Sequence, residues 1–199
     1  MTKIAMGLSF GIALSLVIIA GAELFTGNAF VLYNGWRSKT VTLTDVIRLW
    51  VVCYLGNWFG AIVLSLLFYG AAGTAGGVGQ ALANAAAMKM SLPPLVLFLR
   101  GILCNVLVCL AVWCGFRCKS DSGKLIMVFW CLYAFFTCGF EHSVANMTVL
   151  TLGLLNPAGT AVSVGGYLYN LFMVTLGNIV GAVLFLSIPY GIAAKKIGD

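Results

Sequence analysis

Five long apolar stretches dominate this chain of 199 residues. They cover roughly residues 4–22, 46–69, 95–116, 125–140 and 167–193. Most of them approach the ~20 residues that a helix needs to cross a bilayer. Only 8% of the residues are charged and 62% are hydrophobic, a balance that the water-facing surface of a soluble domain of this length would not tolerate. The sequence therefore predicts an all-α integral membrane protein that forms a single transmembrane domain over residues 1–199.

Basic residues stand at the ends of these stretches and predict their orientation. The formal net charge is +6, but no basic face with interleaved aromatic residues can be drawn, so nucleic acid is not an expected partner. If the stretches alternate in direction, most basic residues fall on one side, which the positive-inside rule assigns to the cytoplasm. These residues are Arg37, Lys39, Arg48, Arg117, Lys119, Lys124, Lys195 and Lys196. We expect a multi-pass protein of the inner (plasma) membrane, surrounded by lipid, with a cytoplasmic C-terminus.

The cysteines give no sign of a metal or haem site. There are seven of them, in or beside apolar stretches, with one histidine in the chain and no paired CxxC motif. Free cysteine commonly behaves as a small packing residue. We therefore expect no cofactor, no metal and no disulfide framework.

Two motifs occur twice in the same order, which indicates duplicated halves. Glu-x4-Asn-x2-Val-Leu begins at Glu23 and again at Glu141. Leu-Gly-Asn-x2-Gly-Ala covers residues 55–61 and again residues 176–182. With the orientation assigned above, the two halves point in opposite directions. We predict an inverted repeat, with a first half-repeat over residues 1–70 and a second over residues 95–193.

The first half starts one helix short of the second. A helix around Arg100 to Trp113 precedes the Glu141 motif, whereas the chain begins with the stretch that leads directly into Glu23. We expect one more spanning helix ahead of Met1 in the native protein, and the alternative is a true five-helix protein. The opening residues also resemble a signal peptide ending near Ala22. Cleavage there would remove half of the repeat, which argues against it.

Each copy of the first motif places a carboxylate at the end of an apolar stretch, where a charge is costly. Gly27 is expected to permit unwound backbone, which a bilayer tolerates only inside protein or along a cavity. We predict two discontinuous helices that meet near the midplane, with N-termini that favour an anion. Glu23 and Glu141 are expected to accept hydrogen bonds from the backbone N–H groups freed there. The alternative is that each glutamate extends to an interface.

His142, the single histidine of the chain, lies beside Glu141 in the second predicted break. A titratable ring at this place is a candidate functional group, and the alternative is a satisfied structural histidine. The repeat places Leu24 opposite His142, with Thr26 close by, so the site would combine a protonatable ring, a hydroxyl and apolar walls. Because a neutral acid enters a low-dielectric constriction far more easily than its anion, proton donation by His142 would suit the passage of a weak acid.

Four strings resemble signatures of the formate/nitrite transporter family. They are AELFTGN from Ala22, GILCNVLVCLAVW from Gly101, GFEHSVANM from Gly139 and VTLGNIVGA from Val174. The resemblance covers essentially the whole chain and is greatest to the hydrosulfide-channel branch. It implies an aquaporin-like fold of six helices, the first of which this chain lacks. It also implies a homopentamer with one pore for a small anion through each protomer.

The resemblance also implies roles for individual residues. By motif position, His142 and Thr26 resemble the central histidine and the loop threonine that faces it. Leu24 and Phe136 resemble an apolar constriction beside them, and Lys89 resembles a vestibule lysine that attracts anions from outside. The further positions that resemble pore or supporting residues are Asn105, Asn146 and Asn178.

The predicted function is channel-like transport of small monovalent anions of weak acids, with hydrosulfide favoured and nitrite and formate as alternatives. A water or neutral-solute channel is a second reading, because Asn156-Pro157-Ala158 reproduces the aquaporin tripeptide, although only one copy occurs and in an expected turn. A non-transporting anchor subunit is a third. Catalysis is not expected, because Glu141 and His142 have no metal and no plausible nucleophile with an oxyanion hole beside them.

Overall fold

The computed structural model describes residues 2–72 and 77–195, which form nine α-helices and one π-helix. Lys196, which the sequence places on the cytoplasmic side, lies outside the described residues. The elements are α1 (Thr2–Ala20), α2 (Phe25–Arg37), α3 (Leu43–Ala72), α4 (Gly77–Ser91), α5 (Pro94–Arg117), α6 (Asp121–Thr137), α7 (Ser143–Leu155), α8 (Val164–Val180), the π-helix η1 (Gly181–Ser187) and α9 (Ile188–Lys195).

Within the described residues, three helical runs are long and apolar enough to cross a membrane. These runs are α3, α5 and the continuous run from α8 through η1 into α9. Helices α1 and α2 together form a fourth candidate span, which is broken and bent by 43°. The remaining predicted stretch corresponds to α6, with 17 residues, followed after a break by α7, with 13. One candidate span is thus discontinuous, and a second break separates α6 from α7.

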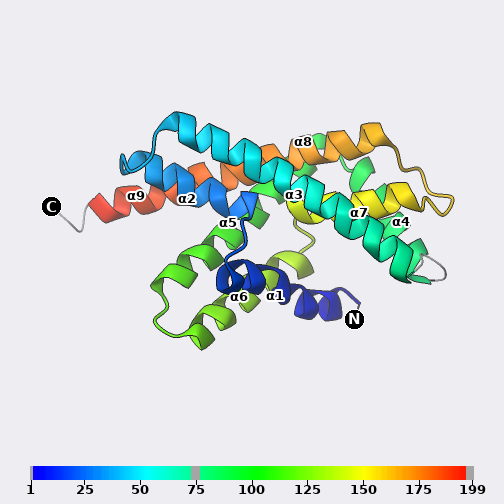
Figure 1. Cartoon of the computed structure of the whole chain (residues 1–199), viewed down its shortest axis with the longest axis horizontal. Coiled ribbons are helices and arrows are strands. Elements are labelled where there is room, and N and C mark those ends of the chain that lie inside the picture. Colours follow the sequence, from blue (N-terminus) through cyan, green and yellow to red (C-terminus); the bar gives the residue numbers. More distant parts are fainter. Residues whose placement is uncertain (1, 73–76, 196–199) are drawn as a thin grey trace.

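Helix α5 lies between two groups of helices and contacts both (Figure 1). On one side it packs against α6, which in turn lies along α1. On the other side it packs against α8 and η1, and α2 joins the same side through its contact with η1. Helix α7 lies between α3 and α4. Both breaks reach α5 or its neighbours, because Leu24 packs against the cluster that α5 forms with α1 and α6, and the N–H of Glu141 donates to the carbonyl oxygen of Arg100 in α5.

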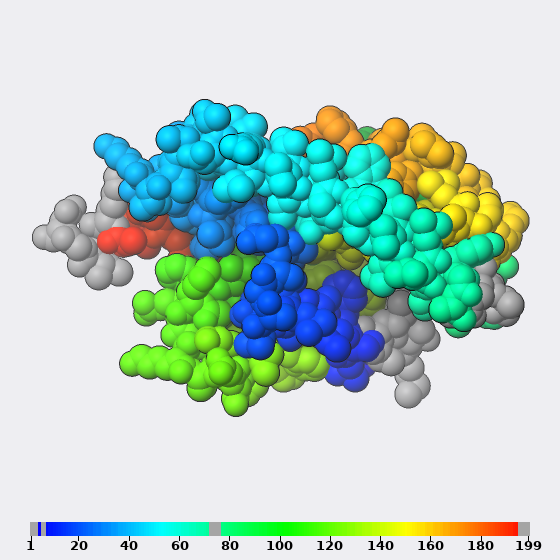
Figure 2. All heavy atoms as spheres, in the orientation of Figure 1, coloured from blue at the N-terminus to red at the C-terminus, as the bar shows by residue number. Residues whose placement is uncertain are grey.

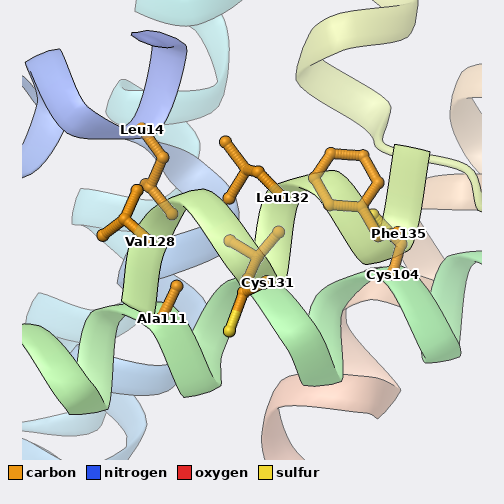
Figure 3. Packing of buried hydrophobic residues seen from close by; sticks show 8 residues of the cluster. Leu14, Cys104, Ala111, Val128, Cys131, Leu132 and Phe135 are labelled. Carbon is orange, nitrogen blue, oxygen red and sulfur yellow. The ribbon is translucent and has the colours of Figure 1, made fainter. Parts of the chain in front are cut away.

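An apolar cluster joins α1, α5 and α6 (Figure 3). These side chains, each 8% exposed or less, hold the three helices together by close packing, because lipid tails provide no hydrophobic driving force between helices. Two cysteines belong to it, in agreement with a packing role. Its buried members are Leu14, Cys104, Val108, Ala111, Val128, Cys131, Leu132 and Phe135.

Glycines of the second Leu-Gly-Asn motif bring the backbone of α5 into direct contact with those of α8 and η1. A side-chain carbon at Gly177 would overlap the carbonyl oxygen of Phe98. One at Gly181 would overlap the carbonyl oxygen of Ile102. Small residues at a helix crossing permit this close approach between transmembrane helices. The contact leaves no room for even one methyl group at either position.

The matching glycines of the first motif copy are open. An added carbon at Gly56 or Gly60 in α3 would meet nothing within 4 Å. In the most apolar stretch of α3, only 11% of the residues are buried. Figure 2 shows this helix, in cyan to green, uncovered along one face of the protomer. The two copies of one motif therefore have different surroundings in the described residues.

Candidate functional site

Two breaks with the same backbone geometry build the site. Each begins with a glycine in the left-handed region, Gly21 at φ 75° and Gly139 at φ 70°, which ends the preceding helix. Each ends with an extended residue that caps the next helix. For Leu24 φ and ψ are −123° and 117°, and for His142 they are −113° and 117°. Leu24 and His142 thus occupy equivalent positions.

Gly27 is not at the break, and the prediction that it permits unwound backbone is wrong. It is the third residue of α2 and is buried, and a side-chain carbon there would lie 3.4 Å from Val112. The unwound backbone lies before it, because Gly21 supplies the positive φ. The sequence carried this signal, since Gly-x-Glu occurs at both breaks, from Gly21 and from Gly139.

An asparagine from a neighbouring helix spans each break. At the first break, the N–H of Phe25 donates to Oδ1 of Asn57 at 2.9 Å, and Nδ2 of Asn57 donates to the carbonyl oxygen of Glu23, also at 2.9 Å. At the second, the N–H of Ser143 donates to Oδ1 of Asn178 at 3.0 Å, and Nδ2 of Asn178 donates to the carbonyl oxygen of Glu141 at 3.0 Å. These amides satisfy polar backbone groups that the breaks leave without helical partners.

The breaks meet through Thr26 and His142. Oγ1 of Thr26 lies 2.9 Å from Nε2 of His142, and both side chains are buried. Nδ1 of the ring accepts the backbone N–H of Ala145 at 3.1 Å, so Nδ1 carries no proton. A neutral ring then carries its proton on Nε2 and donates it to Thr26. The hydroxyl hydrogen of Thr26 is consequently available for another acceptor.

Asn105 of α5 links the two breaks from behind. Its Nδ2 donates to the carbonyl oxygens of Thr26 at 3.1 Å and of Asn178 at 2.7 Å. Because both acceptors are carbonyls, the amide can face them only with its nitrogen. Its Oδ1 is buried without a protein partner, as is Oγ of Ser143. Such groups commonly bind water or another polar molecule.

The carboxylate at the second break belongs to a buried polar network. Oε2 of Glu141 accepts from Nζ of Lys89 at 2.8 Å and from Nδ2 of Asn146 at 2.7 Å. Asn146 also donates to Oδ1 of Asn170 at 2.9 Å, and Asn170 donates to the carbonyl oxygen of Lys89 at 2.8 Å. Side-chain exposure is 2% for Glu141 and 18% for Lys89. The Lys89 ammonium, which was predicted to attract anions, thus forms an ion pair with Glu141.

The carboxylate at the first break has a different environment. Glu23 is exposed, and its Oε2 accepts from Nδ2 of Asn28 at 2.5 Å. Among the described residues it has no ion pair. At both breaks the expectation that glutamates receive the freed N–H groups is wrong, because Asn57 and Asn178 accept the N–H groups of Phe25 and Ser143 instead. A neutral amide is cheaper to bury than a carboxylate.

Aromatic and aliphatic side chains surround this polar centre. Leu24 and Phe136, the predicted constriction, are partly buried and pack against the cluster of α1, α5 and α6. The ring of Phe136 lies 4.9 Å from that of Phe10. The aromatic ring that stacks on His142 is Phe135, at 6.0 Å between ring centres and 22° between planes. The structure thus adds Phe135 to the predicted apolar wall.

A groove of about 390 Å³ opens beside the first break. Glu23 and Leu24 border it, together with Lys124, whose Nζ also contacts Asp121 at 3.0 Å. His142 and Phe136 do not border it. The groove therefore leads to the Leu24 side of the site.

Several contacts of the site were not predicted from the sequence. Asn57 could have been found, because it occupies the position of Asn178 in the duplicated Leu-Gly-Asn motif. Phe135 and Asn170 belong to no duplicated motif. In residues 2–72 and 77–195, no three potential metal ligands lie together.

Known proteins resemble this chain over nearly its full length. A family model described as formate/nitrite transporter matches residues 1–192. The nitrite transporter NirC of Salmonella typhimurium is 39% identical over 194 residues, which cover 97% of this chain and 72% of that protein. A solved FNT family ion channel matches with a TM-score of 0.91 and 39% identity, covering 96% of this chain and 77% of that one. A pentameric formate channel with formate bound matches with a TM-score of 0.84 and 29% identity, covering 97% and 83%.

These matches confirm the predicted fold class, an all-α membrane protein with an aquaporin-like arrangement and broken helices. They also favour transport over the catalytic and water-channel readings. Asn156 and its neighbours lie in the loop between α7 and α8. The chain belongs to the formate/nitrite transporter family.

Proposed function

We propose that this chain forms a homopentameric channel for small monovalent anions of weak acids, and that each protomer conducts them past Thr26 and His142. The observation that carries the proposal is the buried 2.9 Å contact between these side chains, one from each helix break. Two relatives named for nitrite and for formate support this class of cargo. The pentameric formate channel supports the oligomeric state.

Hydrogen bonding rather than a fixed charge holds the anion in this proposal. The neutral ring of His142 donates through Nε2 to Thr26, which turns the threonine hydroxyl hydrogen toward the passage. The N-termini of α2 and α7 add the positive ends of two helix dipoles near the same point. Apolar walls from Leu24 and Phe136 exclude water and strengthen these interactions.

The proton-donor role predicted for His142 then needs a second state of the ring. A protonated imidazole carries hydrogen on both nitrogens, so Nδ1 can no longer accept the N–H of Ala145. Protonation of His142 and this cap of α7 therefore exclude each other. We infer that proton-linked passage alternates between a capped neutral ring and an uncapped charged ring.

We place nitrite first among the cargoes because NirC of Salmonella typhimurium is 39% identical over nearly the whole chain. Hydrosulfide, favoured by the sequence resemblance, is the second candidate. Both ions are small, singly charged and conjugate to weak acids, so the geometry of the site accepts either. The basic residues support a cytoplasmic C-terminus in the inner membrane.

Flux through purified protein in liposomes tests the proposal. Nitrite, hydrosulfide, formate and water would each be followed across the same preparation, with empty liposomes as the control. We expect saturable or pH-dependent uptake of nitrite or hydrosulfide above the empty liposomes, and the faster ion identifies the cargo. Water flux without anion uptake would reject the proposal.

The pentamer is tested separately, by measuring the mass of the detergent-solubilised protein by light scattering. Five copies are expected in each particle. A stable monomer that conducts anions would contradict the proposed pentamer but not the proposed pore within each chain.

A further inference from the structure

Asn57 and Asn178 make the same pair of hydrogen bonds at opposite breaks. Each side-chain oxygen accepts the N–H of the first residue of the next helix, and each side-chain nitrogen donates to the carbonyl oxygen of the acidic residue two positions earlier. The four distances lie between 2.9 and 3.0 Å. Each amide therefore spans the one residue between these two groups, which is Leu24 at the first break and His142 at the second.

We propose that Asn57 and Asn178 are positioning residues for transport. Each fixes the extended backbone of the residue it spans, so that the side chains of Leu24 and His142 project toward the passage. This inference rests on the proposed function, because its consequence is measured as anion flux. It assigns a role to Asn57, which the sequence did not single out, and makes that role equivalent to the role of Asn178.

The task requires a primary amide. A planar group that donates at one end and accepts at the other, 2.9 to 3.0 Å from both partners, satisfies both backbone groups at once. Aspartate accepts but does not donate when ionised, and leucine has a similar volume with neither function. Either change leaves at least one polar backbone group of the break without its side-chain partner.

The two positions differ in burial and in further contacts. Asn178 is 0% exposed, and its Nδ2 also donates to the carbonyl oxygen of Gly101 at 2.8 Å. Its own carbonyl oxygen accepts from Asn105, which also holds Thr26. Asn57 is partly exposed, although Sγ of Cys53 lies 3.8 Å from its Oδ1. Changes at Asn178 should therefore affect both breaks, and changes at Asn57 mainly the first.

The test compares Asn57→Leu, Asn57→Gln and Asn178→Leu with wild type and with Asn84→Leu, a surface asparagine of α4 that contacts Gln80. Flux is measured over a range of anion concentrations and pH values, on protein that has passed a check of oligomeric state. We expect Asn57→Leu to lower maximal flux about tenfold, in line with the loss of two hydrogen bonds that hold the backbone around Leu24. Asn57→Gln keeps both functions and should recover most of this flux.

For Asn178→Leu we expect a similar loss of flux together with a changed pH profile, because this break carries His142. A merely structural role would lower the amount of assembled protein without changing the pH profile of what remains. Normal flux and an unchanged pH profile in assembled Asn57→Leu and Asn178→Leu proteins would overturn the inference. If wild type conducts no anion, the proposed function fails instead.

A measurement on the unmodified protein covers the case in which the variants do not assemble. The amide hydrogens of Phe25 and Ser143 should exchange slowly with solvent, because Asn57 and Asn178 accept them. Rapid exchange at both amides would contradict the two side-chain bonds and overturn the inference.

Discussion

The backbone N–H of Ala145 donates to Nδ1 of His142 at 3.1 Å, which fixes the histidine as the N-cap of α7. The same bond determines which ring nitrogen is protonated, because an accepting Nδ1 leaves the hydrogen on Nε2. The helix cap and the site are therefore coupled through one ring. A change in the charge of His142 must disturb the first turn of α7.

Replacing His142 with asparagine separates these two roles. Asparagine is a favourable N-cap, so His142→Asn should still accept the N–H of Ala145 and assemble normally. It cannot be protonated near neutral pH and does not reproduce the Nε2 contact with Thr26. We expect flux to fall and its pH dependence to weaken in liposomes. Wild-type flux with a wild-type pH profile would exclude a proton-linked role for the ring.

Removing Lys89 should destabilise the protein more than removing Glu141. Lys89→Met leaves a carboxylate that is 2% exposed without its cation, and breaking a buried pair in this way costs about 3–5 kcal/mol. In Glu141→Gln the ammonium is 18% exposed and retains some water. The double variant should regain most of the loss. Thermal unfolding of the four proteins in one detergent would show this order, and equal losses in both single variants would contradict it.

Shortening the apolar wall should relax selectivity. Leu24→Ala combined with Phe136→Ala removes the two partly buried side chains of the predicted constriction and should admit anions larger than formate. Phe135→Ala is the matched comparison, because Phe135 is 2% exposed and its truncation should mainly cost stability, about 3–5 kcal/mol. Uptake of a series of anions of increasing size measures the effect. Continued exclusion of the larger anions by the double variant would place the constriction elsewhere.

Two glycines of the duplicated motif offer a matched pair of stability tests. Gly177→Ala forces a methyl group into the carbonyl oxygen of Phe98, and overpacking of this kind typically costs about 1–3 kcal/mol. Gly56→Ala meets nothing within 4 Å in the described residues and should be neutral or gain up to about 1 kcal/mol from helix propensity. Unfolding midpoints compare the two. A loss in Gly56→Ala as large as that in Gly177→Ala would show that another helix occupies this face of α3.

Hydropathy and the duplicated motifs predicted most of the fold. The five apolar stretches correspond to α1, α3, α5, α6 and the run from α8 to α9, because lipid selects long apolar helices directly. Helix α4 was not predicted, since its alanine-rich sequence lacks a long apolar run. The π-helix η1 has no pattern of its own. Its contacts include distant residues, such as Arg37, whose Nη1 donates to the carbonyl oxygen of Ser187 at 3.0 Å.

The site was only partly predictable, for a physical reason. The duplicated motif identified the two glutamates and, beside them, Thr26 and His142, because both copies can be read directly from the sequence. The freed backbone N–H groups bind Asn57 and Asn178, which belong to helices distant in the sequence. The glutamates of the motif lie nearer in the sequence and were therefore wrongly predicted as the acceptors. Asn57 lies 34 residues from the Glu23 carbonyl that it binds. The duplicated Leu-Gly-Asn motif marks Asn57, but no local pattern identifies the backbone groups that it binds.

The glycine contacts of α5 with α8 and η1 also limit how such a pore can open. Gly177 lies against the carbonyl oxygen of Phe98, and Gly181 lies against that of Ile102. If one of these helices slid along the other, the carbonyl oxygens of α5 would collide with the facing backbone. This pair of helices is consequently a fixed frame. A gate must therefore lie outside this helix pair, for example in side chains that rotate or in the short half-helices that begin at Phe25 and Ser143.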